Sequence, residues 1–192
     1  QLKADYVSAY FNRGIARIRQ GDILGSIDDF SIVLELRPDF NKAHYSRGFA
    51  YSRQGEMSKA IEDYNRATKL NPNHIMAYYQ LGLIYSKQGN MLKAVRNYNK
   101  AISLNSSRAD IYNSKAWFLH LNGQHQDALM DASKAVNLEP NNKFALHTRG
   151  AIHLALGNIH SAIQDFEKAL EIDPEHIEAK EDLAKARAKL NS

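Results

Sequence analysis

The chain has 192 residues, and its content of 44% hydrophobic and 24% charged residues is typical of a folded globular protein rather than a disordered or fibrous one. A net charge of +4 permits nucleic-acid binding without indicating it. The absence of cysteine excludes disulfides, thiolate metal sites and thiol nucleophiles. No run approaches the roughly 18 apolar residues that a membrane-spanning helix needs, so we expect no membrane insertion.

A small residue recurs every 34 residues along almost the whole chain. When it is set as position 8 of a repeat, glycine occupies position 15 of every copy and proline occupies position 32 of all copies but one. Glycine can adopt the left-handed conformation that ends a first helix, and proline prevents a second helix from continuing. The period therefore predicts stacked helix–turn–helix repeats. The residues at position 8 are Gly14, Gly48, Gly82, Ala116 and Gly150.

In chain order, this register predicts a leading segment, five full repeats and a trailing helix. Each repeat is expected to hold a first helix (helix A) over about positions 2–14 and a second helix (helix B) over about positions 18–31. The predicted divisions are 1–6, 7–40, 41–74, 75–108, 109–142, 143–176 and 177–192.

The two ends of the chain continue the pattern in weaker form. Residues 1–6 match positions 29–34, with Leu2 in a leucine column and Ala4 in place of proline, so we interpret them as the tail of a truncated preceding repeat. Residues 177–190 match helix A, and Lys180 and Arg187 replace its usual aromatic-type positions, which predicts a polar capping helix. Its expected buried stripe consists of Ile177, Ala179, Leu183, Ala184 and Ala186.

Two further pairs of columns predict contacts between helices A and B. Positions 7 and 23 carry opposite charges in four repeats, and both charges disappear together in the third, as Leu81 and Asn97. We therefore predict a cation–carboxylate contact in the other four. In the fourth repeat position 24 shrinks to Ala132 and position 10 grows to Phe118, which we expect to fill the freed volume. The charged pairs are Arg13/Asp29, Arg47/Asp63, Lys115/Asp131 and Arg149/Asp165.

Over residues 7–176 these columns resemble the tetratricopeptide repeat (TPR) family. The resemblance implies an all-α fold, a right-handed α-solenoid or superhelix of five TPR helix–turn–helix repeats plus a C-terminal capping helix. It also implies a non-catalytic scaffold or adaptor, which binds an extended or helical segment of a partner protein in a concave groove and needs no cofactor. In the family, helix A lines that groove through positions 2, 5, 6, 9, 12 and 13.

Carried over to this sequence, those positions predict a partner-binding groove and a cationic rim. The groove combines an aromatic and aliphatic ladder with short uncharged hydrogen-bonding side chains, and part of the ladder could instead pack adjacent repeats together. Aromatic anchors such as Trp117 are the expected hot spots. The groove residues are Phe11, Asn12, Ile15, Tyr45, Ser46, Phe49, Tyr79, Gln80, Leu83, Asn113, Trp117 and His120, and the rim residues are Arg19, Arg53 and Lys87.

One known form of TPR recognition is absent from the sequence. Chaperone-binding TPR domains hold a C-terminal carboxylate with a clamp that needs lysine at position 5 and asparagine at position 9. Here both positions are apolar or uncharged throughout, and Lys42, the sole lysine at position 2, is followed by Ser46 where the clamp requires arginine.

The sequence indicates no catalytic or metal site. The eight histidines never form the i, i+4 pair with a carboxylate that a helical zinc site shows, and no carboxylate has a histidine or serine partner at a repeated position. We therefore predict a protein that is not an enzyme and that binds neither metal nor cofactor. The compartment is unknown, with the cytoplasm as the default expectation.

Three alternatives stay open beside the scaffold. The chain could be the substrate-recruiting TPR arm of a larger enzyme. It could bind single-stranded nucleic acid, although the cationic column covers only three repeats and disfavours this partner. In that case the stacking rings would be Tyr45, Phe49 and Tyr79, and the cations that meet phosphates would be Arg19, Arg53 and Lys87. It could also self-associate through its groove or its N-terminal face.

Overall fold

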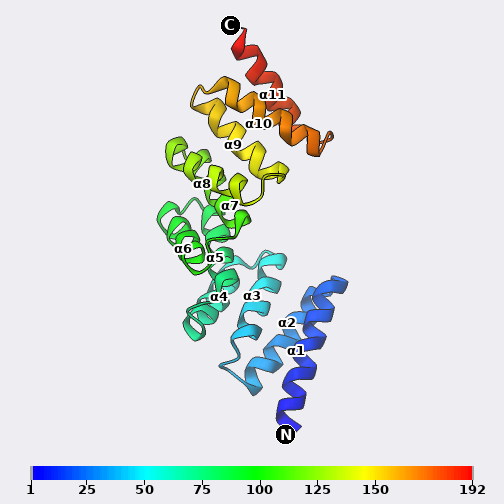
Figure 1. Ribbon diagram of the computed structural model, residues 1–192. Coiled ribbons are helices and arrows are strands. Elements are labelled where there is room, and N and C mark those ends of the chain that lie inside the picture. The colour runs from blue at the N-terminus through cyan, green and yellow to red at the C-terminus, as the bar shows by residue number, and fades with distance from the viewer. Residues whose placement is uncertain (1, 192) are drawn as a thin grey trace. The chain divides into compact units, whose positions relative to one another are not determined.

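The computed structural model describes the backbone of residues 2–191 and the side chains of residues 6–191. Over the described backbone the chain is all-helical, with no strand (Figure 1). No helix of this part is both long and apolar enough to cross a membrane. The helices are α1 (Leu2–Gln20), α2 (Ile23–Leu36), α3 (Asn41–Gln54), α4 (Met57–Leu70), α5 (Ile75–Lys87), α6 (Met91–Leu104), α7 (Ala109–Leu121), α8 (His125–Leu138), α9 (Lys143–Ala155), α10 (Ile159–Ile172) and α11 (Ile177–Leu190).

The helices alternate as the 34-residue register predicts. From α2 to α10 every second helix has 14 residues and begins at repeat position 17, one position earlier than expected. The turn between helices A and B is formed by the position-15 glycines, whose φ angles lie between 69° and 87°. An L-residue rarely adopts this left-handed conformation, which explains why glycine recurs there. The fold of five TPR repeats followed by a capping helix is thereby confirmed.

The glycine at position 8 is required by the ring at position 24 of the same hairpin. A Cβ atom on Gly82 would lie 2.7 Å from the ring of Tyr98, and one on Gly150 would lie 2.7 Å from that of Phe166. In the fourth repeat the facing residue is Ala132, and Ala116 is accommodated. Small and aromatic residues at these two positions are therefore coupled by direct contact.

The predicted ion pairs between helices A and B are confirmed in all four repeats that carry the charges. The four Asp side chains are between 1% and 14% exposed, so each carboxylate is largely withdrawn from water and depends on its partner. The N–O distances are 2.6 Å for Arg13–Asp29, 2.8 Å for Arg47–Asp63, 2.9 Å for Lys115–Asp131 and 2.6 Å for Arg149–Asp165.

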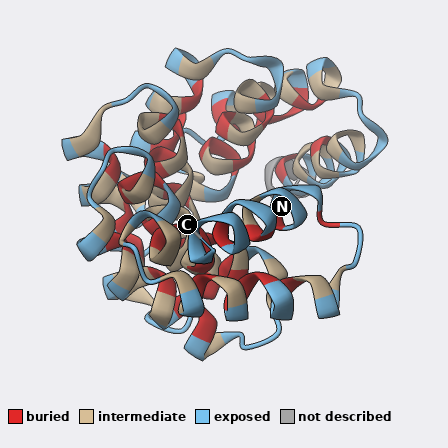
Figure 2. Ribbon diagram, turned by 90° about the horizontal axis from the view of Figure 1, so that it is seen from above, coloured by how far each residue is buried: buried red, intermediate tan, exposed pale blue. Residues whose placement is uncertain are grey.

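The chain forms two compact units, unit 1 over Gln1–Leu104 and unit 2 over Asn105–Ser192. Unit 1 holds α1–α6, and its central cluster packs Tyr64 of α4 against Leu81 and Ile84 of α5. Unit 2 holds α7–α11, where Phe166 of α10 packs with Leu183 of the capping helix. Within the described part of each unit, the buried residues lie on the helices apart from His176 in the turn before α11, and the connecting turns are otherwise mostly exposed (Figure 2).

The two ends differ from the sequence prediction. Helix α1 runs without a break from Leu2 to Gln20, so residues 2–6 continue the first helix A instead of forming a separate tail. Ala4 explains the difference, because alanine does not interrupt a helix as proline does. Gln1 lies outside the described residues.

In α11, Ala179, Leu183 and Ala186 are buried as expected, but Ile177 is 65% exposed and Ala184 is also exposed. The buried residues are spaced by four and three, which places them on one helical face. Ile177 and Ala184 are seven residues apart and share a different face, so they lie outside the predicted stripe.

Candidate functional site

The position-5 rings in unit 1 are half-buried. Each lies against the ring at position 24 of its own hairpin, at a spacing typical of aromatic pairs. One side of the ring thus contributes to packing within the hairpin, and the remaining exposed area is available to a partner. The pairs are Phe11–Phe30 at 5.7 Å, Tyr45–Tyr64 at 5.7 Å and Tyr79–Tyr98 at 6.2 Å between ring centroids.

Position 34, the last residue before helix A of the next repeat, places a second ring beside position 5. This column is not among the predicted groove positions, although it holds the rings of Phe40, His74 and His176. Where a repeat has rings at both position 24 and position 34, the position-5 ring lies between them. The centroid distances are 5.2 Å for Phe11–Phe40, 4.7 Å for Tyr45–His74 and 5.1 Å for His147–His176.

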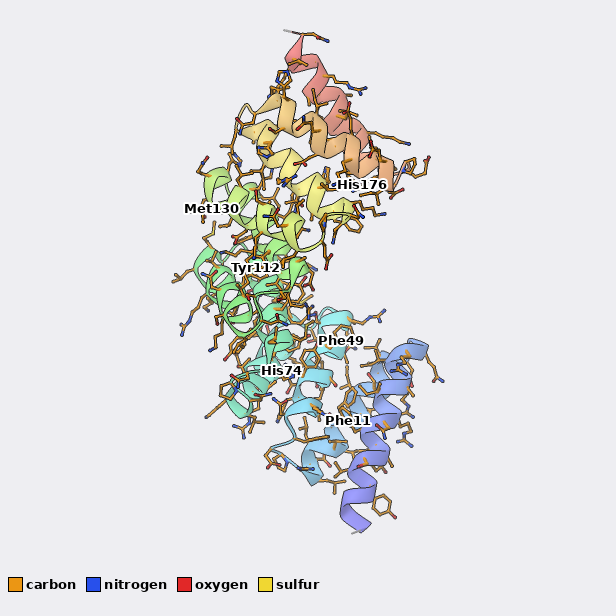
Figure 3. The ribbon with its side chains drawn as sticks, viewed as in Figure 1. Phe11, Phe49, His74, Tyr112, Met130 and His176 are labelled. Carbon is orange, nitrogen blue, oxygen red and sulfur yellow. The ribbon has the colours of Figure 1, made fainter. Side chains whose placement is uncertain are left out.

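The position-9 residues of unit 1, Ile15, Phe49 and Leu83, are also half-buried. Phe49 of α3 packs against the central cluster of unit 1, and Figure 3 marks it and Phe11 on their helices. These residues are neither fully buried nor on a polar outer face. They therefore contribute both to packing and to the accessible surface.

The polar column at position 6 is less uniform than predicted. Asn12 is exposed and Gln80 is half-buried, but Ser46 is only 7% exposed. Ser46 is therefore less accessible than its neighbours in this column, and its role in the groove stays a prediction. Its side chain is short and stays below the surface, whereas the longer Asn12 and Gln80 side chains reach further out.

The three rim cations are exposed and lie in the last turn of helices α1, α3 and α5. Positive charge at this end of a helix is stabilised by the helix dipole. None of Arg19, Arg53 and Lys87 forms an ion pair with a described residue. Their charges therefore face solvent.

In unit 2, Trp117 of α7 is 37% exposed and stacks on His120 at a centroid distance of 5.4 Å. The His120 ring is also bonded to His125, with 3.1 Å between their Nδ1 atoms. Burial, followed by the proximity of His125, lowers the pKa of His120. Asn113, four residues before Trp117, is half-buried, and its Oδ1 atom accepts no hydrogen bond from the described residues.

A cavity of about 390 Å³ opens beside Trp117, between α7, α9 and α11. We call it the acidic pocket. Apart from His176, the residue that precedes α11, its lining residues stand at positions 2, 5, 6 and 9 of helix A when α11 is numbered as a sixth such helix. They are Trp117, Phe144, His147, Thr148, His176, Glu178, Glu181 and Asp182 (Figure 3 labels His176).

The ionisable groups of the acidic pocket are arranged in pairs. His147 Nε2–H donates to Asp182 at 3.1 Å, and His176 Nδ1–H donates to Glu178 at 3.1 Å. Burial lowers the pKa of His147 against the raising effect of Asp182. Burial would raise the pKa of Asp182, but hydrogen bonds from Lys185 and His147 outweigh it and hold that pKa below its usual value.

The acidic pocket includes functional candidates that the sequence analysis missed. We treated α11 only as a polar cap and therefore did not consider Glu178, Glu181 and Asp182. The signal was present, because α11 follows the helix-A register and these carboxylates occupy its positions 2, 5 and 6. Among the described residues, no group of three or more His, Asp or Glu side chains is arranged to hold a metal ion.

The observed geometry defines a protein built from stacked two-helix repeats. Models of the TPR repeat match residues 51–89, and models of the tetratricopeptide repeat match residues 75–108, 97–130 and 144–176. The chain belongs to the tetratricopeptide repeat family. No curated protein sequence matches it.

Several solved TPR structures are similar to the chain. The TPR protein YrrB, described as having an unusual peptide-binding site, is 20% identical with a TM-score of 0.75, over 90% of this chain and 89% of that one. The MamA protein is 25% identical with a TM-score of 0.79, over 90% and 94%. The first TPR of Spaghetti (RPAP3), bound to the HSP90 peptide SRMEEVD, is 27% identical with a TM-score of 0.60, over 62% and 94%.

Proposed function

We propose that the chain is a non-catalytic protein-interaction scaffold whose helix-A surfaces hold an extended or helical segment of a partner protein. The observation that carries the proposal is the partial exposure of apolar side chains on helix A in both units, with Phe49 half-buried and Trp117 37% exposed. Apolar area left accessible beside polar groups commonly marks an interface. A repeat array offers such a surface on each successive helix A.

The similar proteins support this function. YrrB has a peptide-binding site, and the RPAP3 domain is bound to a peptide. Both are TPR arrays, and the same fold here carries accessible rings at helix-A positions. A scaffold also needs none of the catalytic constellations that the sequence lacks.

The partner's bound segment is expected to differ from the HSP90 peptide in chemistry. That peptide ends in Glu-Val-Asp, whereas the carboxylate-clamp positions of this chain hold Phe11, Tyr45 and Tyr79 in place of lysine. Rings at these positions favour apolar or aromatic side chains of a partner over a terminal carboxylate. We retain the predicted groove residues, Ser46 included, together with the repeat boundaries from 7–40 to 143–176, as parts of this proposal.

A second candidate function, binding of single-stranded nucleic acid, is favoured by one observation. Residues 64–109 contain seven Lys and Arg but no Asp or Glu. Within unit 1 this stretch lines a cavity of about 290 Å³ that includes Lys93, Arg96 and Tyr85. Cations beside aromatic rings suit phosphates and stacked bases.

The scaffold proposal is tested by selecting peptides from a random phage-displayed library on the purified chain. We expect binders, and we expect Phe49→Ala/Trp117→Ala to lose them while keeping its helicity. The matched control is Leu92→Ala/Met130→Ala, which removes two helix-B side chains that are 80% and 74% exposed. Retained binding by the first variant, or equal loss in the control, would contradict the assignment of the binding surface to helix A.

A further inference from the structure

We propose that the acidic pocket of unit 2 binds the side chain of an arginine in the partner's segment, an inference that rests on the proposed scaffold function. The pocket combines an accessible aromatic wall with three carboxylates on one helix. Trp117 and Phe144 are 37% and 58% exposed, and Glu178, Glu181 and Asp182 all belong to α11. Each of these residues lines the same cavity.

The charge balance of the acidic pocket favours a cation. Glu181 forms no ion pair with a described residue. Asp182 is shared between His147 at 3.1 Å and Lys185 at 2.8 Å, and among the described residues Glu178 forms an ion pair with His176 alone. The nearby Lys143 is paired with Asp173, and its Nζ lies 4.9 Å from the centre of the Phe144 ring. Three carboxylates therefore face one lysine, and an added positive charge would reduce their mutual repulsion.

His176 supplies an independent indication of a hydrogen-bond donor. Its side chain is 6% exposed and lines the pocket. Because Nδ1–H donates to Glu178, Nε2 of the neutral ring is an acceptor, and it has no partner among the described residues. A buried acceptor without a donor is destabilising, and a ligand that carries N–H groups would satisfy it after a small shift of the ring.

Arginine fits these features better than lysine. Its guanidinium group is planar, stacks on aromatic faces and carries five N–H donors that bind carboxylates in pairs. The accessible ring of Trp117 offers the stacking surface, and Glu181 and Glu178 offer acceptors. The ammonium of lysine is a compact charge with three donors and gains less from a flat ring.

The pocket is specific to unit 2. In unit 1, the matching positions 2, 5 and 6 of α3 are Lys42, Tyr45 and Ser46, and those of α5 are Met76, Tyr79 and Gln80. None of them is a carboxylate. An arginine-containing segment is therefore directed to unit 2 by charge and not by the repeat fold as such.

The direct test is a titration of the ¹⁵N-labelled chain with N-acetyl-arginine methylamide, followed by NMR at the indole N–H of Trp117, which is the single tryptophan. Nα-acetyl-citrulline methylamide, a neutral analogue of nearly the same shape, and Nα-acetyl-lysine methylamide serve as comparison ligands. We expect a saturable shift with arginine, and binding about tenfold weaker with citrulline. Equal binding of arginine and citrulline, or no saturable shift with arginine, would overturn the proposal.

Two single-residue variants test whether the carboxylates of α11 bind the arginine ligand. Glu181→Gln removes an exposed carboxylate without breaking an ion pair, and we expect it to weaken arginine binding about two- to fivefold. Glu171→Gln, which removes an exposed charge from α10 outside the pocket, should leave binding unchanged. If both variants bind arginine as the wild type does, the α11 carboxylates do not recognise the ligand.

The titration separates failure of this inference from failure of the scaffold function. If selected peptides lack basic residues and the arginine analogue does not titrate Trp117, the scaffold function stands and the arginine assignment falls. Another outcome is that no peptide is selected, while the arginine analogue binds and Glu181→Gln weakens its binding. That result would support the pocket as a guanidinium site and contradict the scaffold function. Enrichment of arginine in peptides that depend on Glu181 would support both.

Discussion

Units 1 and 2 are built from the same kind of repeat but carry net charges of opposite sign. Residues 1–104 carry 15 Lys and Arg against 9 Asp and Glu, and residues 105–192 carry 10 against 12, which gives net charges of +6 and −2. In unit 1 the rim cations lie in the last turn of each helix A, whereas in unit 2 carboxylates of α11 line the acidic pocket. The charge of each unit is thus set at positions other than the glycine, proline and ion-pair columns that hold the fold.

The ion pairs between helices A and B also differ from repeat to repeat. Four repeats place an Asp beside a cation, buried in three of them and half-buried as Asp131 in the fourth, but the third repeat, in unit 1, has Leu81 and Asn97 at the same positions. The fold therefore accepts either the complete pair or its complete absence. What it should not tolerate is half of a pair, because the remaining carboxylate would be buried without its partner.

The largest effect is expected from breaking one pair in unit 2. Arg149 donates two hydrogen bonds, at 2.8 and 2.6 Å, to Asp165, which is 5% exposed. Arg149→Leu should lower the free energy of unfolding by about 1–3 kcal/mol, since Asp165 loses both donors. Urea denaturation followed by circular dichroism measures the change. The double variant Arg149→Leu/Asp165→Asn, which copies the third repeat, should recover most of it; equal losses in both variants would mean that the ion pair is not the cause.

A smaller effect is expected at the helix crossing. Gly82→Ala in unit 1 would place a Cβ 2.7 Å from the buried ring of Tyr98. Overpacking costs about 1–3 kcal/mol, and the better helix propensity of alanine returns about 1 kcal/mol, so a net loss of about 1 kcal/mol is expected in thermal or urea unfolding. Ala116→Gly in unit 2, where the facing residue is Ala132, tests propensity alone. Stabilisation by Gly82→Ala would refute the coupling of positions 8 and 24.

Acidification should weaken unit 2 more than unit 1. Burial lowers the pKa of His120, His147 and His153 in unit 2, and of His74 alone in unit 1. When the pKa of a histidine is lower in the folded protein than its value of about 6.5 in the unfolded chain, folding disfavours protonation of the ring. Its contribution to the stability of the fold is therefore complete above about pH 6.5 and is lost as the pH falls below that value.

Hydrogen exchange at pH 7.5 and pH 5.5, corrected for intrinsic rates, measures this difference by unit. We expect the protection of α9 and α11 to decrease more than that of α3 and α4. Asp182 should contribute little in this range, because its lowered pKa keeps its stabilisation until a more acidic pH. Equal losses in the two units would contradict the prediction.

The smallest effect is expected on the affinity of unit 1 for polyanions. If unit 1 binds single-stranded nucleic acid, the affinity for an oligo(dT) should fall steeply between about 50 and 200 mM salt, and Lys93→Gln/Arg96→Gln should reduce it. The control Lys134→Gln/Lys168→Gln removes two exposed cations from unit 2 and should have little effect. Absence of binding at low salt would exclude this second function and leave the charge of unit 1 for protein partners.

Much of the fold could be predicted from local rules. Gly55 and its equivalents mark each turn because a left-handed residue is needed there, and Pro38 or Pro72 marks the end of helix B. The pairing of Arg149 with Asp165 was legible because both columns change together. The site was harder to predict, because a position on a helix does not by itself tell how far its side chain reaches from its neighbours. For that reason the exposure of Ile177 was misjudged, and the low exposure of Ser46 was not foreseen.

By itself, the sequence determined the repeat length, the alternation of helices A and B, the TPR family and the ion pairs, because each depends on residues at fixed spacing within one hairpin. Only the tertiary structure decided which helix-A side chains are accessible and which carboxylates share a cavity with Trp117. Those properties depend on the packing of α7, α9 and α11 against one another, where exposure is set by the side chains of three helices distant in the chain.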